Sequence, residues 1–189
     1  FLGPVAGCQG STREPILGGP CENCELVFVG MPKDIQSAAR IAPKDEKGDP
    51  LVLEGTVQRV SGDPVPGIIV YAYHTDAGGI YPRSTTRHGR LRAWARSDKD
   101  GHYHFDTIRP GSYPSGDNPQ HIHMHVIEPG RGTYWIDDVV FDDDPLLTSR
   151  HPRHNRGGSG ETHPERDEAG VWHVRRNIVL GAEVSGYSP

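Results

Sequence analysis

Three histidines alternate with apolar residues in the segment NPQHIHMHV, residues 118–126. In a β-strand this alternation places His121, His123 and His125 on one face and the intervening apolar side chains on the other. A rise of ~3.3 Å per residue separates His121 from His125 by about 13 Å, but neighbouring histidines by only about 6.6 Å. Because metal–nitrogen bonds are about 2 Å long, one ion fits between His121 and His123 or between His123 and His125, and sharing by all three is disfavoured.

Histidine spacing alone does not distinguish a metal site from a solvated strand face. The segment GHYHFD repeats the pattern at His102 and His104, where both imidazoles can face water. We expect the polar stretch 142–170 to be a surface excursion. Its three histidines are expected to be solvated rather than ligating: His151, His154 and His163. To decide whether the histidine strand binds a metal, further candidate ligands must be found elsewhere in the sequence.

The elements that must position these residues are short strands. Of the 189 residues 34% are hydrophobic, and 24 glycines and 17 prolines favour strands and turns over long helices. Apolar runs predict strands at 51–60, 68–75, 101–108, 121–127, 133–141 and 171–180. Residues 32–50 show at most one weak helical turn. About seven short strands predict an all-β, two-sheet sandwich in a single domain, residues 21–189, after a tail at residues 1–20.

Two tyrosines precede the histidine strand in Gly- and Pro-containing turns. Tyr81 follows a Gly-Gly pair in VYAYHTDAGGIYPR, and Tyr113 lies in TIRPGSYPSGDNP, directly upstream of HIH. The ordered series GTV, PVPG, AGGIY, SDKDGHYHFDTIRPGSYP, HIH and FDDDP covers roughly residues 51–145. It resembles the intradiol ring-cleavage dioxygenases, the family of protocatechuate 3,4-dioxygenase and catechol 1,2-dioxygenase. No single segment is specific, but their order and spacing together are.

The resemblance implies a non-haem Fe(III) site. In this family two tyrosines and two histidines hold ferric iron, and the matching positions are Tyr81, Tyr113, His121 and His123. The family pattern uses the first two histidines of the strand, which leaves His125 as a neighbour of the site or a solvent-facing residue. Phenolate is a hard, anionic ligand that suits Fe(III) better than Fe(II) or zinc. Two phenolates and one hydroxide would also balance the charge of the ion in a partly buried site.

The resemblance also implies a reaction and its substrates. A small catechol and O2 would react so that the ring opens between its two hydroxylated carbons and both oxygen atoms enter a cis,cis-muconate. Tyr113 would accept a catechol proton as a general base. Other partner classes have little support in the sequence. The net charge of −5 comes without a basic stripe for nucleic acid, and no apolar run approaches the 18 residues of a membrane span.

The residues around the expected ligands depart from the family pattern. Family members carry an arginine three residues before the first ligand histidine, where this chain has Asn118, and a glutamine where it has Asp138. Neither an amide nor a carboxylate replaces a cation as a charge stabiliser. We expect Asn118, Asp138 and Arg83 to contact the substrate. The candidates for the missing charge are Arg83, Arg109 and Arg131, among which the sequence does not choose; the alternative, which we favour for each of them, is a surface arginine.

The three cysteines are compatible with an exported protein, extracellular, periplasmic or anchored at the cell surface. The opening FLGPVAGC resembles the lipobox of bacterial lipoproteins, in which Cys8 would be lipidated; a plain N-terminal tail is the alternative. Cys21 and Cys24 form a CxxC pair, which suits a zinc half-site, a redox pair, a disulfide or two free thiols. A second CxxC for a zinc ribbon and a βαβ context for a redox motif are both missing, so for an exported chain we favour the disulfide.

Two other functions stay open at the level of the sequence. GDPVPGIIV and SDKDGHYHFDTI also fit transthyretin-like or carboxypeptidase-regulatory-like sandwiches, which are binding modules without a metal. Such a module has no need for two tyrosines followed by HxH. The other alternative is a degenerate dioxygenase that binds iron and catechols but turns over poorly, and Asn118 and Asp138 are its basis.

Overall fold

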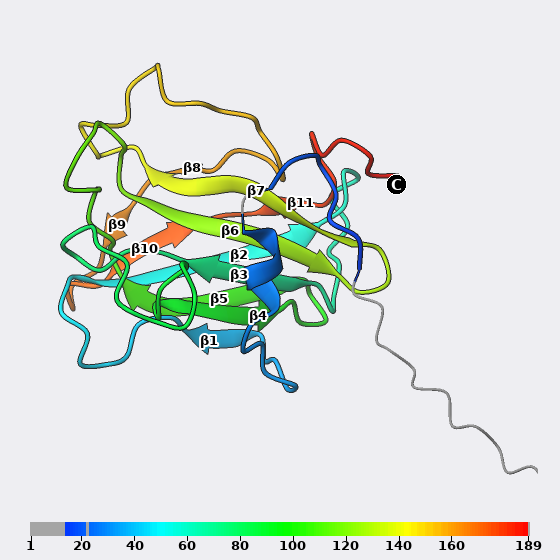
Figure 1. Cartoon of the computed structure of the whole chain (residues 1–189), viewed down its shortest axis with the longest axis horizontal. Helices are drawn as coiled ribbons and strands as arrows, with labels where there is room; N and C mark the ends of the chain where they lie inside the picture. The colour runs from blue at the N-terminus through cyan, green and yellow to red at the C-terminus, as the bar shows by residue number, and fades with distance from the viewer. Residues whose placement is uncertain (1–13, 22, 189) are drawn as a thin grey trace, which may run out of the picture.

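The computed structural model describes residues 14–21 and 23–188, and Cys8 with its lipobox-like segment lies outside the described residues. The chain forms two β-sheets with long loops (Figure 1), so the prediction of an all-β, two-sheet sandwich is confirmed. The strand order is β1-β5-β2-β10-β9 in the first sheet, with β11 beside β2, and β4-β3-β6-β7-β8 in the second. None of the helical segments within the described residues is long and apolar enough to span a membrane.

The elements follow one another along the chain with short strands throughout. Their bounds are η1 (Cys24–Phe28, a 3-10 helix), β1 (Ala38–Arg40), β2 (Pro50–Gln58), β3 (Ile69–Tyr73), β4 (Arg92–Arg96), β5 (His102–Ile108), β6 (His121–Glu128), β7 (Gly132–Phe141), β8 (Glu161–Thr162), β9 (Glu165–Arg166), β10 (Trp172–Arg175) and β11 (Ile178–Val179).

All six predicted ranges contain strands, and three differences are informative. The run 171–180 is divided into β10 and β11, and β1 lies in the stretch where at most a helical turn was expected. Strand β4 has no counterpart among the predicted strands. Its inward-facing residues are alanines, and its other face carries Trp94 between two arginines. The apolar signal of the segment is therefore weak, although Ala93 and Ala95 are buried.

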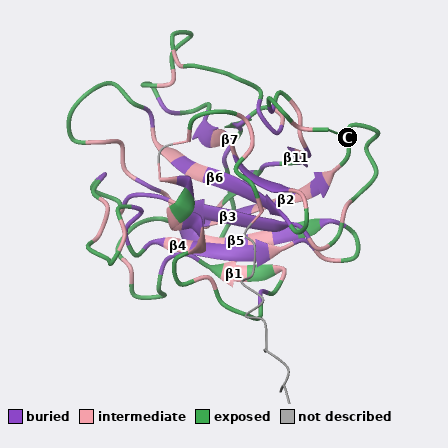
Figure 2. Cartoon of the chain, turned by 45° about the vertical axis from the view of Figure 1, so that its right-hand side comes forward, coloured by how far each residue is buried: buried purple, intermediate pink, exposed green. Residues whose placement is uncertain are grey.

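The core between the sheets explains the orientation of the histidine strand. Ile122, Met124 and Val126 of β6 are each at most 1% exposed and belong to the main hydrophobic cluster. Burial of each such side chain contributes about 1.5–3 kcal/mol, which fixes the face that β6 turns inward. The alternating histidines must therefore lie on the outer face of the second sheet. The buried strands and the exposed loops around them are visible in Figure 2.

A second, smaller cluster covers part of that outer face. The 3-10 helix η1 lies across β3 and β6 (Figure 1). The cluster consists of Val27, Ile35, Ile69, Tyr71, Trp94 and Ile127. The Trp94 indole donates a hydrogen bond of 2.9 Å to the carbonyl oxygen of Val27, which anchors η1 to the sheet. The outer face is thus apolar and covered at one end and polar at the other, where the candidate site lies.

Part of the segment expected as a tail lies on the sheet. The amide of Leu17 donates to the carbonyl oxygen of Thr133, and the amide of Thr133 donates to Pro15, both at 2.8 Å. The amide of Gly18 donates to the carbonyl oxygen of Ser185 at 2.9 Å. These bonds place residues 15–18 beside β7, within the stretch 1–20 that composition assigned to a tail.

Candidate metal centre

His121 and His123 are held in a defined orientation by hydrogen bonds to their Nδ1 atoms. Nδ1 of His121 lies 2.7 Å from the carbonyl oxygen of Pro119, and Nδ1 of His123 lies 3.1 Å from Oδ1 of Asp138. Both partners are acceptors, so each imidazole carries its proton on Nδ1 and presents a free lone pair on Nε2. This is the arrangement in which protein histidines bind metal ions.

A β-bulge in β7 places Asp138 behind His123. The register between β6 and β7 shifts in the middle of the pair, so that two residues, Asp137 and Asp138, stand opposite His123. Bulges of this kind re-aim side chains next to functional sites. Asp137 accepts backbone N–H groups of residues 154–156, while Asp138 is left to bond His123. The two adjacent carboxylates thus have separate tasks.

The two tyrosine-bearing loops are fastened to each other by Asp76. Its carbonyl oxygen accepts the amides of Gly79 at 3.0 Å and Gly111 at 2.8 Å. A Cβ atom at Gly79 would lie 1.8 Å from the carbonyl oxygen of the residue before Tyr113, and one at Gly111 would lie 2.4 Å from a carbonyl oxygen of the other loop. Glycine is therefore required at both contacts. The close approach of the loops brings Tyr81 and Tyr113 to the same point.

Four polar side chains converge at that point. Oη of Tyr81 lies 2.7 Å from Oη of Tyr113 and 2.8 Å from Nε2 of His123. Oη of Tyr113 lies 3.2 Å from Nε2 of His121 and 3.5 Å from Nε2 of His123. The structure therefore brings together all four residues that the family resemblance selected, although they come from two loops and one strand.

Burial favours the neutral forms of Tyr81, Tyr113 and His121. Burial raises the pKa of Tyr81, and the nearby Tyr113 raises it further; burial likewise raises the pKa of Tyr113. Burial and the proximity of His123 lower the pKa of His121. A bound cation would reverse the effect on the phenols by stabilising phenolate. Two phenol oxygens and two imidazole nitrogens form a donor set suited to a hard ion such as Fe(III), so the residues present fit that metal.

The cluster opens into a cavity of about 700 Å³. Tyr81, Tyr113 and His123 form part of its lining, and residues 151–155 form part of a wall. That wall belongs to the polar stretch 142–170, much of which arches beyond β7 and β8 (Figure 1). His154 and His163 are exposed, as expected. His151 differs, because it is half-buried in the cavity wall.

Of the three residues expected to contact substrate, Asn118 and Asp138 line the cavity and Arg83 does not. Asn118 is exposed and lines the cavity. Asp138 also lines it, but its carboxylate is bonded to His123. Burial alone would raise the pKa of Asp138, but the three neighbouring histidines, chiefly His123, together lower it. Arg83 is exposed and is not among the residues that line the cavity.

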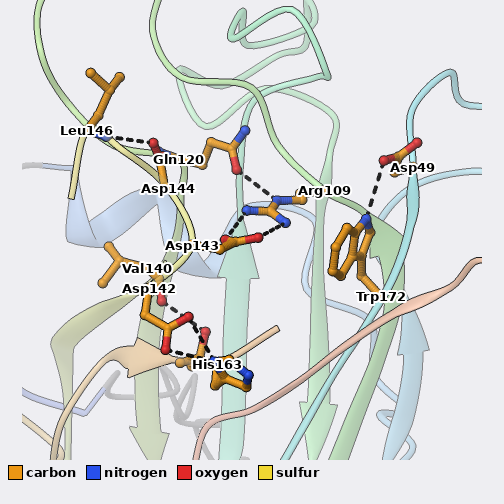
Figure 3. Close-up of polar contacts among 11 residues, drawn as sticks. Asp49, Arg109, Gln120, Val140, Asp142, Asp143, Asp144, Leu146, His163 and Trp172 are labelled. Atoms are coloured by element: carbon orange, nitrogen blue, oxygen red, sulfur yellow. Dashed lines mark hydrogen bonds and ion pairs between the residues drawn. The ribbon is translucent and has the colours of Figure 1, made fainter. Parts of the chain in front are cut away.

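Arg109 and Arg131 are engaged elsewhere. Arg109 forms two hydrogen bonds of 2.9 and 2.5 Å to Asp143 and one of 2.8 Å to Gln120 (Figure 3). It thereby fixes the residue directly before His121. Arg131 bonds the carbonyl oxygen of Ser188, far along the sheet from the cluster. Neither guanidinium supplies a charge to the cavity.

Arg87 is the arginine that sequence reasoning missed. It is exposed, lines the cavity, and makes no hydrogen bond or ion pair with another described residue. Arg153, which also lines the cavity, is paired with Glu161 at 2.9 Å. The only sequence signal for Arg87 was its place in the loop that follows Tyr81.

Cys21 and Cys24 form a disulfide in the structure, as the sequence favoured. The disulfide lies against the histidine strand, because Sγ of Cys21 is 3.8 Å from Nε2 of His125. His125 is only 5% exposed. It is therefore a buried neighbour of the four-residue cluster, and the solvent-facing alternative is wrong.

Replacing Asp138 by Asn is expected to weaken metal retention. The amide keeps the shape but loses the charge on the acceptor for His123 Nδ1, and changes of this kind cost about 10–100-fold in metal affinity or activity. Competition with a chelator measures the loss. Asp167→Asn is a matched control, because it alters a carboxylate–histidine pair of 2.9 Å with His173 on the surface. Equal iron retention by Asp138→Asn and the control would contradict the role assigned to Asp138.

Comparison with known proteins finds dioxygenases. The family model described as "Dioxygenase" matches residues 27–154. The chain is 31% identical to a protocatechuate 3,4-dioxygenase beta chain of Burkholderia cepacia over 53% of this chain and 48% of the relative. It is 31% identical to a hydroxyquinol 1,2-dioxygenase of Nocardioides simplex over 74% of this chain and 50% of the relative. The chain thus spans about half the length of these two relatives.

Solved structures share the fold at lower identity. The dioxygenase domain of a dioxygenase–carbohydrate-binding protein fusion from Streptomyces sp. SirexAA-E aligns with a TM-score of 0.62 at 20% identity, covering 79% of this chain and 91% of that one. An intradiol ring-cleavage dioxygenase from Tetranychus urticae aligns with a TM-score of 0.58 at 18% identity, covering 94% and 96%. The family match extends over more than half of the sequence and includes all four clustered residues. The chain belongs to the intradiol ring-cleavage dioxygenase family.

Proposed function

We propose that the protein is a non-haem Fe(III) dioxygenase that opens the ring of small catechols between the two hydroxylated carbons. The observation that carries the proposal is the convergence of the phenol oxygens of Tyr81 and Tyr113 with the Nε2 atoms of His121 and His123. A metal-free binding module would need none of these contacts. The acceptors at both Nδ1 atoms add support, because they leave Nε2 free to bind a metal.

The four side chains have distinct tasks in this proposal. Ferric iron, held by all four, would supply the electron-accepting centre for the reaction of catechol with O2. Oη of Tyr81 lies 2.8 Å from Nε2 of His123, and Nδ1 of His123 bonds Asp138. These contacts make Tyr81 and His123 the rigid part of the centre. Tyr113 is half-buried, directly before an exposed turn, and contacts both Tyr81 and His121. Its phenolate oxygen accepts a proton from the catechol as the substrate enters.

The cavity binds and orients the substrate. Its volume of about 700 Å³ lies within the usual range for small-molecule sites and leaves room beside a single aromatic ring. Asn118 offers an amide at the rim, and Arg87 offers a guanidinium that no described residue neutralises. Arg87 is therefore the side chain best placed to meet negative charge on a bound catecholate.

The decisive experiment is spectroscopic and catalytic. Ferric tyrosinate absorbs broadly in the visible range, so the purified, iron-loaded protein is expected to be wine-red to brown, with one iron per chain by elemental analysis. Oxygen consumption and muconate absorbance are then measured with catechol, protocatechuate and hydroxyquinol. A colourless protein that retains no iron would refute the metal centre. A coloured protein that consumes no oxygen with any of the three would identify a degenerate homologue.

A further inference from the structure

A second group of potential metal ligands lies beside the proposed iron centre and shares none of its four residues. Sγ of Cys21, Sγ of Cys24 and one imidazole nitrogen of His125 all lie within 4.8 Å of one another. The sequence had shown a CxxC half-site without the further ligand that a zinc site needs. The fold supplies that ligand from a position 104 residues away.

The distance between Cys21 and His125 fits a tetrahedral zinc site. Bonds of about 2.3 Å to sulfur and about 2.0 Å to nitrogen place the two donors about 3.6 Å apart at the tetrahedral angle. Sγ of Cys21 lies 3.8 Å from Nε2 of His125, so this edge of the site is already formed. The short CxxC spacing lets Cys21 and Cys24 chelate one ion without a change in the fold.

Burial gives a second, independent observation. His125 is 5% exposed and Cys24 is fully buried. Nδ1 of His125 is buried without a hydrogen-bond partner among the described residues, and Nε2 contacts only the sulfur of Cys21. Nε2 is therefore the ring nitrogen that faces the sulfurs and is available to an ion held by Cys21 and Cys24. Cys21 and His125 also line the cavity, which gives solvent and ions access to the group.

We propose that the reduced protein binds Zn²⁺ through Cys21, Cys24 and His125, with the fourth position open to solvent in the cavity, and that the disulfide closes this site. Thiolate and imidazole favour zinc over the hard ions that phenolates prefer. A dithiol reductant opens the site: the Cys21–Cys24 sulfur–sulfur bond breaks and two thiols form, while the reductant becomes a disulfide. Zinc binding then releases the two thiol protons. The bound ion would link η1 to β6 through Cys24 and His125.

Cobalt binding to the full chain tests the proposal. The protein is stripped of metals, reduced with a phosphine, and titrated with Co²⁺, whose thiolate complexes have a near-ultraviolet charge-transfer band. We expect one equivalent to produce the band and Zn²⁺ to abolish it. The oxidised protein should produce none, and this comparison requires no mutation. The double variant Tyr81→Phe/His123→Ala should keep the band, so the result does not depend on the proposed iron centre.

Single variants identify the ligands. Cys24→Ser should lose the band, and His125→Gln should bind cobalt at least tenfold more weakly. Cys8→Ser, which changes the third cysteine, should behave as the wild type. Far-ultraviolet circular dichroism establishes that each reduced protein is folded. A folded, reduced wild type without the band would overturn the proposal, as would unchanged affinity in His125→Gln.

Discussion

Replacement of Tyr113 by Phe is expected to lower kcat for catechol cleavage at least about 100-fold while iron stays bound. Positioned proton transfer contributes about 10²–10⁴-fold to rates, and the Tyr113 hydroxyl is the group assigned to it. Phenylalanine keeps the aromatic packing against His121, whose ring centroid lies 5.0 Å away, and removes only the oxygen. Tyr81, His121 and His123 remain to hold the ion.

The measurement is oxygen consumption at saturating catechol, normalised to the iron content of each preparation. Tyr187→Phe is a matched control, because it removes a phenolic hydroxyl bonded at 3.1 Å to Glu128, outside the cavity lining. The control should retain wild-type turnover. Wild-type kcat in iron-matched Tyr113→Phe would disprove the proton-accepting role while leaving the metal centre intact.

Replacement of Arg176 by Met is expected to lower the free energy of unfolding by about 3 kcal/mol. Arg176 is 1% exposed, and its guanidinium donates to the carbonyl oxygens of Gly157 at 2.9 Å, Asn177 at 2.6 Å and Gly158 at 3.1 Å. Methionine fills much of the same volume but leaves these acceptors unsatisfied, at about 1–3 kcal/mol each. The variant no longer has to bury a charged guanidinium, and this gain offsets part of the loss.

Urea unfolding measures this effect as a lower midpoint at an unchanged slope. Arg175→Met is the control from the neighbouring position, because Arg175 is exposed and its ion pair of 2.6 Å with Glu54 lies on the surface. Exposed pairs contribute about 0–1 kcal/mol, so the control should unfold near the wild-type midpoint. Equal midpoints for the two variants would show that the hydrogen bonds from Arg176 to these carbonyl oxygens do not stabilise the fold.

The sequence by itself determined the orientation of the histidine strand and the types of ligand. Side chains of a strand alternate with a period of two, so the apolar residues of HIHMHV had to be buried and the histidines had to lie on the other face. The tyrosines were singled out by the resemblance to the family, which depends on the order of short segments along the chain, and local sequence specifies the turns in which they lie. The weak apolar pattern of β4 shows the limit of this approach.

Only the tertiary structure decided which partners these residues have. A bulge in β7 turns Asp138 to His123, and the alternation of a regular strand does not predict a bulge. Arg109 is paired with Asp143, whereas Arg87, which the sequence did not single out, lines the cavity without a hydrogen-bond or ion-pair partner among the described residues. His125 is buried beneath a disulfide 104 residues away. Such contacts depend on strand register and on how distant segments pack, whereas periodicity and turn chemistry act between neighbours in the chain.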